Sequence, residues 1–355
     1  MNTITDNINI NNMKKVISPK DLVKWLELDK QTAEKVVMWR NITSDIIHKK
    51  DNRILTVVWP CSIHNTKEAL DYAKKLKTLE LKYPNLFIVM RTYFEKPRTT
   101  IGWKGLINDP HLNGSFDIEE WLKKARELLV DISNIWLPVS TEFLDPISPQ
   151  YIWDLITWWA IWARTTESQI HRELASWLSA TVWFKNGTDW SVQIAIDAIW
   201  SASKTHNFLW VWKDWCTELV ETSWNSNTHL ILRWGNHWPN YDSESIDNAT
   251  KNLENAWIET WIMIDASHAN SLKDHNNQIK VIREVAEQIK NWNKNITWIM
   301  IESNINAWNQ SFNAWKDDPK KLEYGISITD KCVDFETTEE MLEILDEAVE
   351  ERKSL

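Results

Sequence analysis

The chain has 355 residues, of which 43% are hydrophobic and 25% charged, so it can bury a large core, and a barrel domain of about 250 residues plus extensions would fill it. A formal charge of -10 argues against a nucleic-acid partner, and three cysteines do not make a disulfide framework. The sequence has neither a run of about 18 apolar residues nor a signal-peptide pattern in residues 1–13. We therefore expect a soluble, cytoplasmic protein.

The chain contains 26 Trp beside only 6 Gly, although glycine normally makes up about 7% of residues and turns need its positive φ. Several tryptophans occupy positions at turns or strand ends where glycine is usual, such as Trp59 before Pro60 and Trp234 beside Gly235. We infer that many of them are glycines misread, most simply from UGA codons that the source organism translates as glycine. The richness in Asn, Ile and Lys suits an AT-rich genome, where UGA would be frequent. The alternative is a truly Trp-rich protein.

In chain order, residues 1–50 form an N-terminal extension with helical character from Ser18 onward, and residues 51–355 alternate between β-rich and helical stretches. The apolar β-rich runs are residues 54–58, 86–91, 137–142, 159–164, 181–185, 229–233, 261–265 and 297–302. Helices are predicted over residues 67–81, 118–130, 148–157, 167–177, 192–201 and 272–289. This alternation predicts a closed (β/α)8 barrel, the TIM-barrel form of the α/β class.

Residues 205–227 break the alternation. Residues 208–211 and residues 219–222 are two short segments rich in apolar and β-forming residues, which is typical of two paired strands. We therefore predict a β-hairpin inserted into one of the loops that follow a barrel strand.

Polar side chains close seven of the apolar runs. They are Arg91, Glu142, Arg164, Lys185, Arg233, Asp265 and Glu302. In a (β/α)8 barrel these strand ends converge on the active site, and four basic residues in an acidic protein indicate a site for an anion with several oxygens, such as a phosphate or carboxylate. Lys96, Arg98 and Thr99 follow the second run on a loop stiffened by Pro97, which suits a phosphate clamp or a solvated turn.

A second set of side chains could hold a metal. Cys61 follows the first run, His268 follows the seventh, Glu302 ends the eighth, and Asp330 lies in the next segment. One thiolate, one imidazole and two carboxylates suit a borderline divalent ion such as Mn, Fe, Co or Zn. Because the spacing is not a compact metal motif, a buried cysteine and a core histidine remain the alternative at this point.

Long strings of the sequence resemble the type I 3-deoxy-D-arabino-heptulosonate-7-phosphate (DAHP) synthases, in the branch of feedback-regulated bacterial and yeast enzymes. The resemblance runs from about residue 15 to about residue 350. Its strings are PCSIH (60–64), MRTYFEKPRTTIGWKGL (90–106), ARTTES (163–168), FKNGTD (184–189), DASHAN (265–270) and YGISITD (324–330). The family pattern has glycine where this chain has Trp59, Trp159, Trp162, Trp177, Trp183, Trp190, Trp234, Trp298 and Trp308. By contrast, Trp103 and Trp158 match family tryptophans.

The resemblance implies a metal-dependent transferase that condenses phosphoenolpyruvate with erythrose 4-phosphate, the first step of the shikimate pathway. It implies the metal ligands Cys61, His268, Glu302 and Asp330. It implies the phosphoenolpyruvate contacts Arg91, Lys96, Arg164, Lys185 and Arg233, with Glu142 nearby, and an erythrose 4-phosphate clamp of Arg98 and Thr99. Lys96, Cys61 and His268 form the expected catalytic set. We expect Lys96, its pKa lowered beside a metal, to protonate the developing alkoxide.

The extension and the hairpin resemble the parts that form an aromatic amino-acid inhibitor pocket in this branch. The expected lining residues are Pro149, Gln150, Leu178, Ser179, Phe208 and Trp210. Glycine at position 210 would leave room beside the ring, so we expect tyrosine rather than phenylalanine as the inhibitor. We also expect a homodimer or a homotetramer.

Two other functions stay open. One is the related barrel synthase that uses arabinose 5-phosphate, and the loop at residues 96–100 argues against it because that relative differs there. The other is a non-catalytic regulatory homologue that binds a partner enzyme. The intact set of four metal ligands argues against such a loss of activity.

Overall fold

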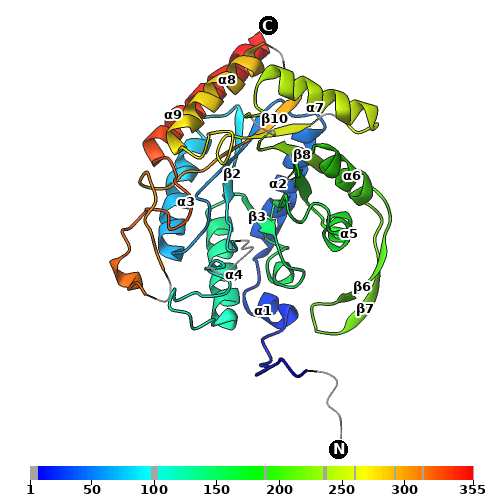
Figure 1. The fold of residues 1–355 in the computed structure, drawn as a ribbon, viewed down its shortest axis with the longest axis vertical. Helices are drawn as coiled ribbons and strands as arrows, with labels where there is room; N and C mark the ends of the chain where they lie inside the picture. Colours follow the sequence, from blue (N-terminus) through cyan, green and yellow to red (C-terminus); the bar gives the residue numbers. More distant parts are fainter. Residues whose placement is uncertain are drawn as a thin grey trace, which may run out of the picture.

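The computed structural model describes residues 7–96, 103–187, 189, 191–234, 238–259, 261–291, 293–313 and 316–354. Within them, eight parallel strands close into a barrel in the order β1-β10-β9-β8-β5-β4-β3-β2, and a two-stranded hairpin of β6 and β7 stands beside it (Figure 1). The barrel strands are β1 Ile54–Val58, β2 Leu86–Arg91, β3 Val139–Phe143, β4 Trp158–Ile161, β5 Thr181–Lys185, β8 Thr228–Leu232, β9 Ile262–Asp265 and β10 Ile296–Ile301. The predicted fold class is confirmed.

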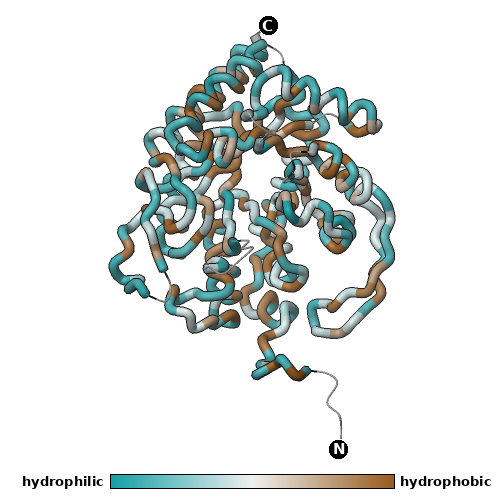
Figure 2. Tube along the Cα trace, in the orientation of Figure 1, coloured by the Kyte–Doolittle hydropathy of each residue, from teal (hydrophilic) through white to brown (hydrophobic). Residues whose placement is uncertain are grey.

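The barrel strands are buried along their whole length because the interior of the barrel covers one face and the outer helices cover the other. In Figure 2 the hydrophobic colour accordingly concentrates on the strands and on the inner sides of the helices. The covering helices are α3 Thr66–Glu80, α4 Ile118–Asn134, α5 Gln169–Trp177, α6 Gln193–Ala202, α7 Ser243–Asn255, α8 Gln278–Lys290 and α9 Phe335–Ser354. Side chains of Asn65, Asp117 and Asp242 cap the amino ends of α3, α4 and α7.

Two of the predicted helices are wrong in whole or in part. Residues 148–157 form only the short 3-10 turn Ser148–Tyr151. The carbonyl oxygens of Trp153 and Ile156 accept hydrogen bonds from the Arg40 side chain instead of from the backbone amides of a helix. The helix predicted over residues 272–289 begins at Gln278. Leu272 and Lys273 have φ angles of 57° and 60°, which a right-handed helix does not accommodate.

The hairpin formed by β6 (Asn207–Val211) and β7 (Thr217–Glu221) follows helix α6 and precedes strand β8. It therefore lies on a helix-to-strand connection, and its predicted place after a strand is wrong. Such connections meet the amino ends of the strands, so the hairpin starts from the end opposite the barrel mouth. Its tip reaches α1 (Pro19–Trp25), where the Lys20 amide donates to the Lys213 carbonyl at 2.9 Å (Figure 1).

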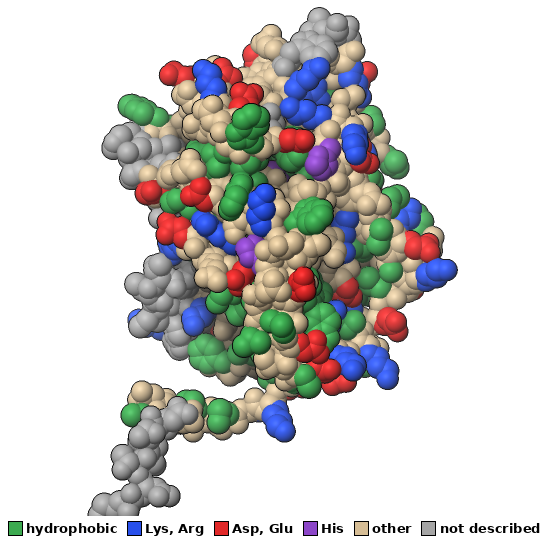
Figure 3. All heavy atoms as spheres, turned by 90° about the vertical axis from the view of Figure 1, so that its right-hand side faces the viewer, with side chains coloured by type: hydrophobic (Ala, Val, Ile, Leu, Met, Phe, Trp, Pro, Cys, Tyr) green, Lys and Arg blue, Asp and Glu red, His purple; other side chains and the backbone are tan. Residues whose placement is uncertain are grey.

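Helix α2 (Lys30–Ile47) also packs at the amino ends of the strands, where the hydroxyls of Thr43 and Thr181 are 2.9 Å apart. Among the described helices, none has the length and apolarity needed to span a bilayer. On the face drawn in Figure 3, acidic and basic side chains are interspersed.

Several tryptophans adopt a backbone conformation that favours glycine. Their φ angles are positive, a region rarely occupied by bulky residues. They are Trp59 (155°), Trp136 (62°), Trp215 (68°), Trp257 (57°) and Trp308 (86°). Inside the barrel, the rings of Trp158 and Trp183 are 3.8 Å apart between centroids, and Trp298 lies 4.9 Å from Trp158.

Candidate active site

A cavity of about 960 Å³ opens at the carboxyl ends of the barrel strands. Its lining contains most of the residues predicted as substrate contacts or metal ligands: Arg91, Lys96, Glu142, Arg164, Lys185, Arg233, His268, Glu302 and Asp330. Arg98 and Thr99, predicted to clamp erythrose 4-phosphate, lie outside the described residues. Side chains from seven strands and their following loops thus meet in one place, as the strand-end argument predicts.

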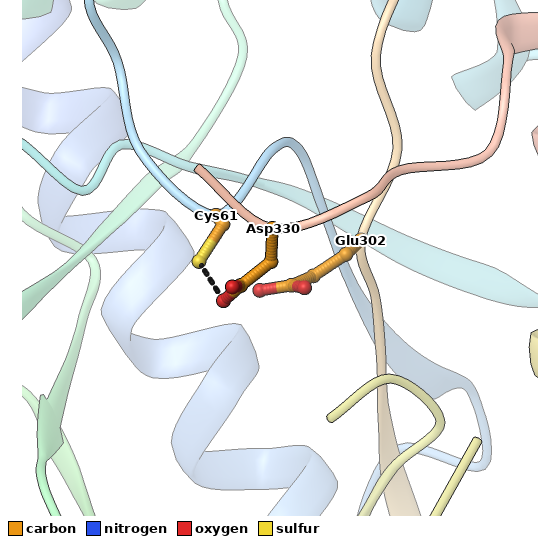
Figure 4. A group of neighbouring side chains, drawn as sticks. All are labelled: Cys61, Glu302 and Asp330. Carbon is orange, nitrogen blue, oxygen red and sulfur yellow. Dashed lines mark hydrogen bonds between the residues drawn. The ribbon is translucent and has the colours of Figure 1, made fainter. Parts of the chain in front are cut away.

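Three of the four predicted metal ligands form a compact group. The ligand atoms of Cys61, Glu302 and Asp330 all lie within 4.8 Å of one another (Figure 4). The Cys61 thiol donates a hydrogen bond to Oδ2 of Asp330 at 2.7 Å. His268 adjoins the group through Glu302, since its Nε2 lies 3.7 Å from Oε1 of that carboxylate.

Lys96 reaches into this group. Its Nζ contacts Sγ of Cys61 and lies 3.5 Å from Oδ2 of Asp330. Burial, together with Glu302, raises the pKa of Cys61 to about 12, although Lys96 opposes the shift, so the thiol must lose a proton before it can bind a cation. Burial alone would lower the pKa of Lys96, but Cys61 and Asp330 outweigh it and raise this pKa. That direction is opposite to the one expected beside a metal.

The residues of this group fit a divalent cation. Oε1 of Glu302 is buried and accepts no hydrogen bond within the described parts of the chain, although the Arg91 guanidinium lies 3.0 Å away. Burying a carboxylate oxygen without a hydrogen-bond donor costs free energy unless a bound cation takes the place of the donor. A thiol, two carboxylates and a neighbouring imidazole are the donor set that a borderline divalent ion prefers.

Near the group of Cys61, Glu302 and Asp330, the cavity wall contains buried cationic side chains. Nζ of Lys185 lies 3.3 Å from Oε1 of Glu142, and both side chains are almost fully buried. Burial lowers the pKa of Lys185, while Glu142 opposes this shift. The guanidinium of Arg91 stacks 3.9 Å from the ring centroid of Tyr93. An anionic substrate would therefore meet positive charge held in fixed positions at low solvent exposure.

Several residues of this cavity have no role predicted from the sequence. Tyr93 lines it, two residues after Arg91 and therefore on the same side of an extended segment, which is the signal that could have found it. Gln278 clamps Glu302, since its amide donates to the Glu302 carbonyl and accepts from the Glu302 amide, both at 2.9 Å. Ser267 also lines the cavity.

The sequence predicts for Asp265 only a place at the end of a strand. Its carboxylate is fully buried, and its Oδ2 lies 2.7 Å from Nδ1 of His268. Burial would raise the pKa of Asp265, but His268 and Lys185 outweigh it and lower this pKa. Asp265 therefore carries its charge next to a predicted metal ligand.

The residues predicted to bind an inhibitor lie around the hairpin. Gln150 follows Pro149 in the 3-10 turn and donates to the Val211 carbonyl at 2.8 Å. The rings of Phe208 and Trp210 are 6.2 Å apart between centroids. Leu178 and Ser179 line a separate cavity of about 250 Å³, whose wall also includes Trp177. Trp177 connects the two parts, because its ring lies 6.2 Å from that of Phe208.

Comparisons with known proteins agree with this geometry. Residues 27–343 match the DAHP synthetase I family. A phospho-2-dehydro-3-deoxyheptonate aldolase of Corynebacterium glutamicum is 48% identical over 342 residues, covering 95% of this chain and 92% of the relative. The tyrosine-inhibited aldolase of Schizosaccharomyces pombe is 49% identical over 325 residues, covering 91% and 87%, and the Phe-sensitive aldolase of Escherichia coli is 45% identical over 355, covering 99% and 100%.

A solved structure gives the same result. The phospho-2-dehydro-3-deoxyheptonate aldolase of Francisella tularensis superposes with a TM-score of 0.93 at 50% sequence identity, covering 97% of this chain and 99% of that one. The strand-end cavity, the family match and these relatives all agree. The chain belongs to the DAHP synthetase I family.

Proposed function

We propose that this chain acts as a DAHP synthase, joining phosphoenolpyruvate to erythrose 4-phosphate with release of phosphate, at the first step of the shikimate pathway. The observation that carries the proposal is that one cavity is lined both by Glu302 and Asp330, which form a compact group with Cys61, and by the buried cations Arg91 and Lys185. A site of this kind accommodates a multiply charged anion beside a Lewis acid.

Phosphoenolpyruvate brings a carboxylate and a phosphate into the cavity. Arg91, Lys96, Arg164, Lys185 and Arg233 line the wall and would neutralise these groups. Glu142 keeps Lys185 in place through their ion pair. Arg98 and Thr99 would hold the phosphate of erythrose 4-phosphate. Fixing both substrates in this way turns their condensation into a reaction between groups already aligned, with C3 of the enol facing the aldehyde carbon.

Cys61, His268, Glu302 and Asp330 would hold a divalent cation, Mn, Fe, Co or Zn, which supplies polarisation of the aldehyde oxygen. The ammonium of Lys96 lies among these ligands and would give its proton to the alkoxide that forms when C3 bonds to the aldehyde carbon. Water then adds at C2 and loses a proton. The resulting hemiketal phosphate expels inorganic phosphate and leaves the ketone of DAHP.

We also propose that an aromatic amino acid inhibits this activity at the hairpin. The pocket would take its lining from the residues beside β6, with Gln150 tying the 3-10 turn to that strand. The extension at residues 1–50 and the hairpin at about 205–227 would serve regulation and subunit contacts in a homodimer or homotetramer. Relatives that carry the words Tyr-sensitive and Phe-sensitive in their names support an aromatic inhibitor.

The experiment is a phosphate-release assay with phosphoenolpyruvate and each of two aldoses. Release with erythrose 4-phosphate, but not with arabinose 5-phosphate, is expected. Release with arabinose 5-phosphate alone would identify the related synthase. Failure with both aldoses in the presence of Mn²⁺ would favour the non-catalytic homologue. Lys185→Met should reduce the rate by removing a buried cation, whereas Lys353→Met on α9, away from the cavity lining, should not.

A further inference from the structure

Asp265, the last residue of strand β9, is tied to the residues that follow it. Its Oδ1 accepts hydrogen bonds from the Ser267 amide at 3.0 Å and from the Ser267 hydroxyl at 2.6 Å. Its Oδ2 lies 2.7 Å from Nδ1 of His268. Because Asp265 and Ser267 are buried, water does not compete for these contacts.

The position of a proton on His268 follows from counting donors. A serine hydroxyl has one hydrogen, and that of Ser267 is directed at Asp265, whose carboxylate only accepts. The same hydroxyl oxygen lies 2.9 Å from Nδ1 of His268, so in this second contact it must accept. The Ser267 oxygen therefore requires a hydrogen on Nδ1, whereas Oδ2 of Asp265, although 2.7 Å from Nδ1, forms no hydrogen bond within the described chain.

With the proton on Nδ1, the lone pair of a neutral imidazole is on Nε2. Nε2 is the atom that lies 3.7 Å from Oε1 of Glu302, and it is therefore the ring nitrogen nearer to the candidate cation ligands. The backbone keeps the ring there at a cost, because His268 has a φ of 46°. Its carbonyl accepts from the Lys273 amide at 2.9 Å and from the Ser271 hydroxyl at 3.0 Å, which holds this conformation.

We propose that Asp265 is a positioning residue that acts through the Ser267 hydroxyl to keep the proton of His268 on Nδ1, leaving Nε2 free to bind the divalent cation. The inference rests on the metal site of the proposed function and adds two residues to it. An outer carboxylate that orients a ligating imidazole typically contributes about 10–100-fold to metal affinity. Asp265 would make no contact with either substrate, so its effect should appear in metal binding.

Three variants separate this role from a structural one. Asp265→Asn keeps the volume and an oxygen for Ser267 but turns an amide donor toward Nδ1, which favours the wrong tautomer. Ser267→Ala removes the hydroxyl that connects Asp265 to His268 and leaves the Asp265 carboxylate in place. Asp274→Asn is the matched control, because it removes an exposed carboxylate beside His275 on the same loop. Affinity for Mn²⁺ is measured by competition with a chelator, and melting temperature reports folding.

We expect Asp265→Asn to weaken Mn²⁺ binding by about 10–100-fold, Ser267→Ala by less, and Asp274→Asn by under about twofold. In the metal-free protein with ¹⁵N-labelled histidine, NMR should show His268 protonated at Nδ1 and should show the proton moved in Asp265→Asn. A His268 protonated at Nε2 in the unaltered protein would overturn the inference without any variant. Unchanged Mn²⁺ affinity in both Asp265→Asn and Ser267→Ala would also overturn it. Absence of Mn²⁺ binding by the unaltered protein would instead count against the proposed metal site.

Discussion

Nη1 of Arg91 lies 3.0 Å from Oε1 of Glu302, and both side chains are buried. Removing one partner of a buried ion pair leaves the other charge uncompensated and costs about 3–5 kcal/mol. We expect Arg91→Met to lower the free energy of unfolding by about that amount in metal-free protein. The loss should be smaller with Mn²⁺ present, because the cation would neutralise Glu302. Urea unfolding with and without Mn²⁺ measures both values.

The control for this comparison is Arg283→Met. Arg283 and Glu340 are also 3.0 Å apart, but both are exposed, so their pair should contribute at most about 1 kcal/mol and should not respond to Mn²⁺. An Arg91→Met loss that is equal in the two conditions would mean that Glu302 does not bind the cation.

Chelation should abolish phosphate release, and Mn, Fe, Co or Zn should restore it. Cys61→Ala should not be rescued by added metal, since the variant lacks a buried ligand that lies beside Glu302 and Asp330. Cys216→Ala is the matched control because this cysteine is exposed at the hairpin, and it should keep full activity. Full turnover by chelator-treated, metal-free protein would contradict the assignment of all four ligands.

The strands could be predicted because each is a short apolar run between polar segments, and β1, β2 and β5 have the predicted bounds. The strand-end rule then placed Arg91, Lys185 and Glu302 in one cavity. Residues 148–157 could not be predicted, because the groups that take their carbonyl oxygens come from Arg40, more than a hundred positions away. The side of the barrel on which the hairpin lies depended on where α6 ends, which periodicity does not fix.

In the candidate site, too, some features could be predicted from the sequence and others could not. Residue types at strand ends follow from the sequence, but hydrogen-bond direction does not. The chain from Asp265 through Ser267 to His268 depends on distances that only the folded loop sets, including a positive φ at His268. No periodic pattern indicates such a conformation in a non-glycine residue.

Glu68 should make stability depend on pH. It is buried near His64, whose Nε2 lies 3.6 Å from Oε2 of Glu68, and burial raises the pKa of Glu68 from 4.5 to about 7. Between these values the folded protein binds more protons than the unfolded chain, so stability falls as the pH rises through this range. Glu68→Gln should remove this loss, a gain of roughly 3 kcal/mol above pH 7 at about 1.4 kcal/mol per pKa unit.

Urea unfolding of Glu68→Gln and its parent at pH 5 and pH 8 measures the effect. The pH 8 comparison isolates Glu68, because His64, whose pKa burial lowers to about 4, is neutral there in both the folded and the unfolded state. Glu343→Gln, an exposed position on α9, is the control and should change neither value. A variant no more stable than its parent at pH 8 would show that the charge on the buried Glu68 does not lower the free energy of unfolding.

Inhibition should depend on the hairpin. With glycine at position 210, tyrosine should inhibit phosphate release more strongly than phenylalanine, because the space beside Phe208 would admit a ring hydroxyl. Phe208→Ala should relieve inhibition and leave the uninhibited rate unchanged, since the hairpin begins at the end of the barrel opposite the mouth. Leu219→Ala, an exposed position on β7, is the control. Inhibition by phenylalanine and not by tyrosine would contradict this assignment.

The last prediction is that a form with glycine at the suspect tryptophans folds better than the form with tryptophan. Trp183 and Trp298 fill the barrel interior beside Trp158, and within the described chain neither indole nitrogen has a hydrogen-bond partner. Trp136 and Trp257 have φ near 60°, which costs a non-glycine residue roughly 1–2 kcal/mol each. Overpacking adds about 1–3 kcal/mol per site, and a domain has only about 5–15 kcal/mol of stability.

Both forms are expressed, with Trp103 and Trp158 kept in each, and compared in soluble yield, thermal unfolding and phosphate release. The glycine form should give more soluble protein and a higher melting temperature. The gene offers a second, independent reading, because UGA codons are expected at the suspect positions and UGG codons at Trp103 and Trp158. A tryptophan form that is soluble, cooperative and equally active would show that these indoles belong to the protein. UGG at Trp183 and Trp298 would lead to the same conclusion, and the crowded barrel would then require another explanation.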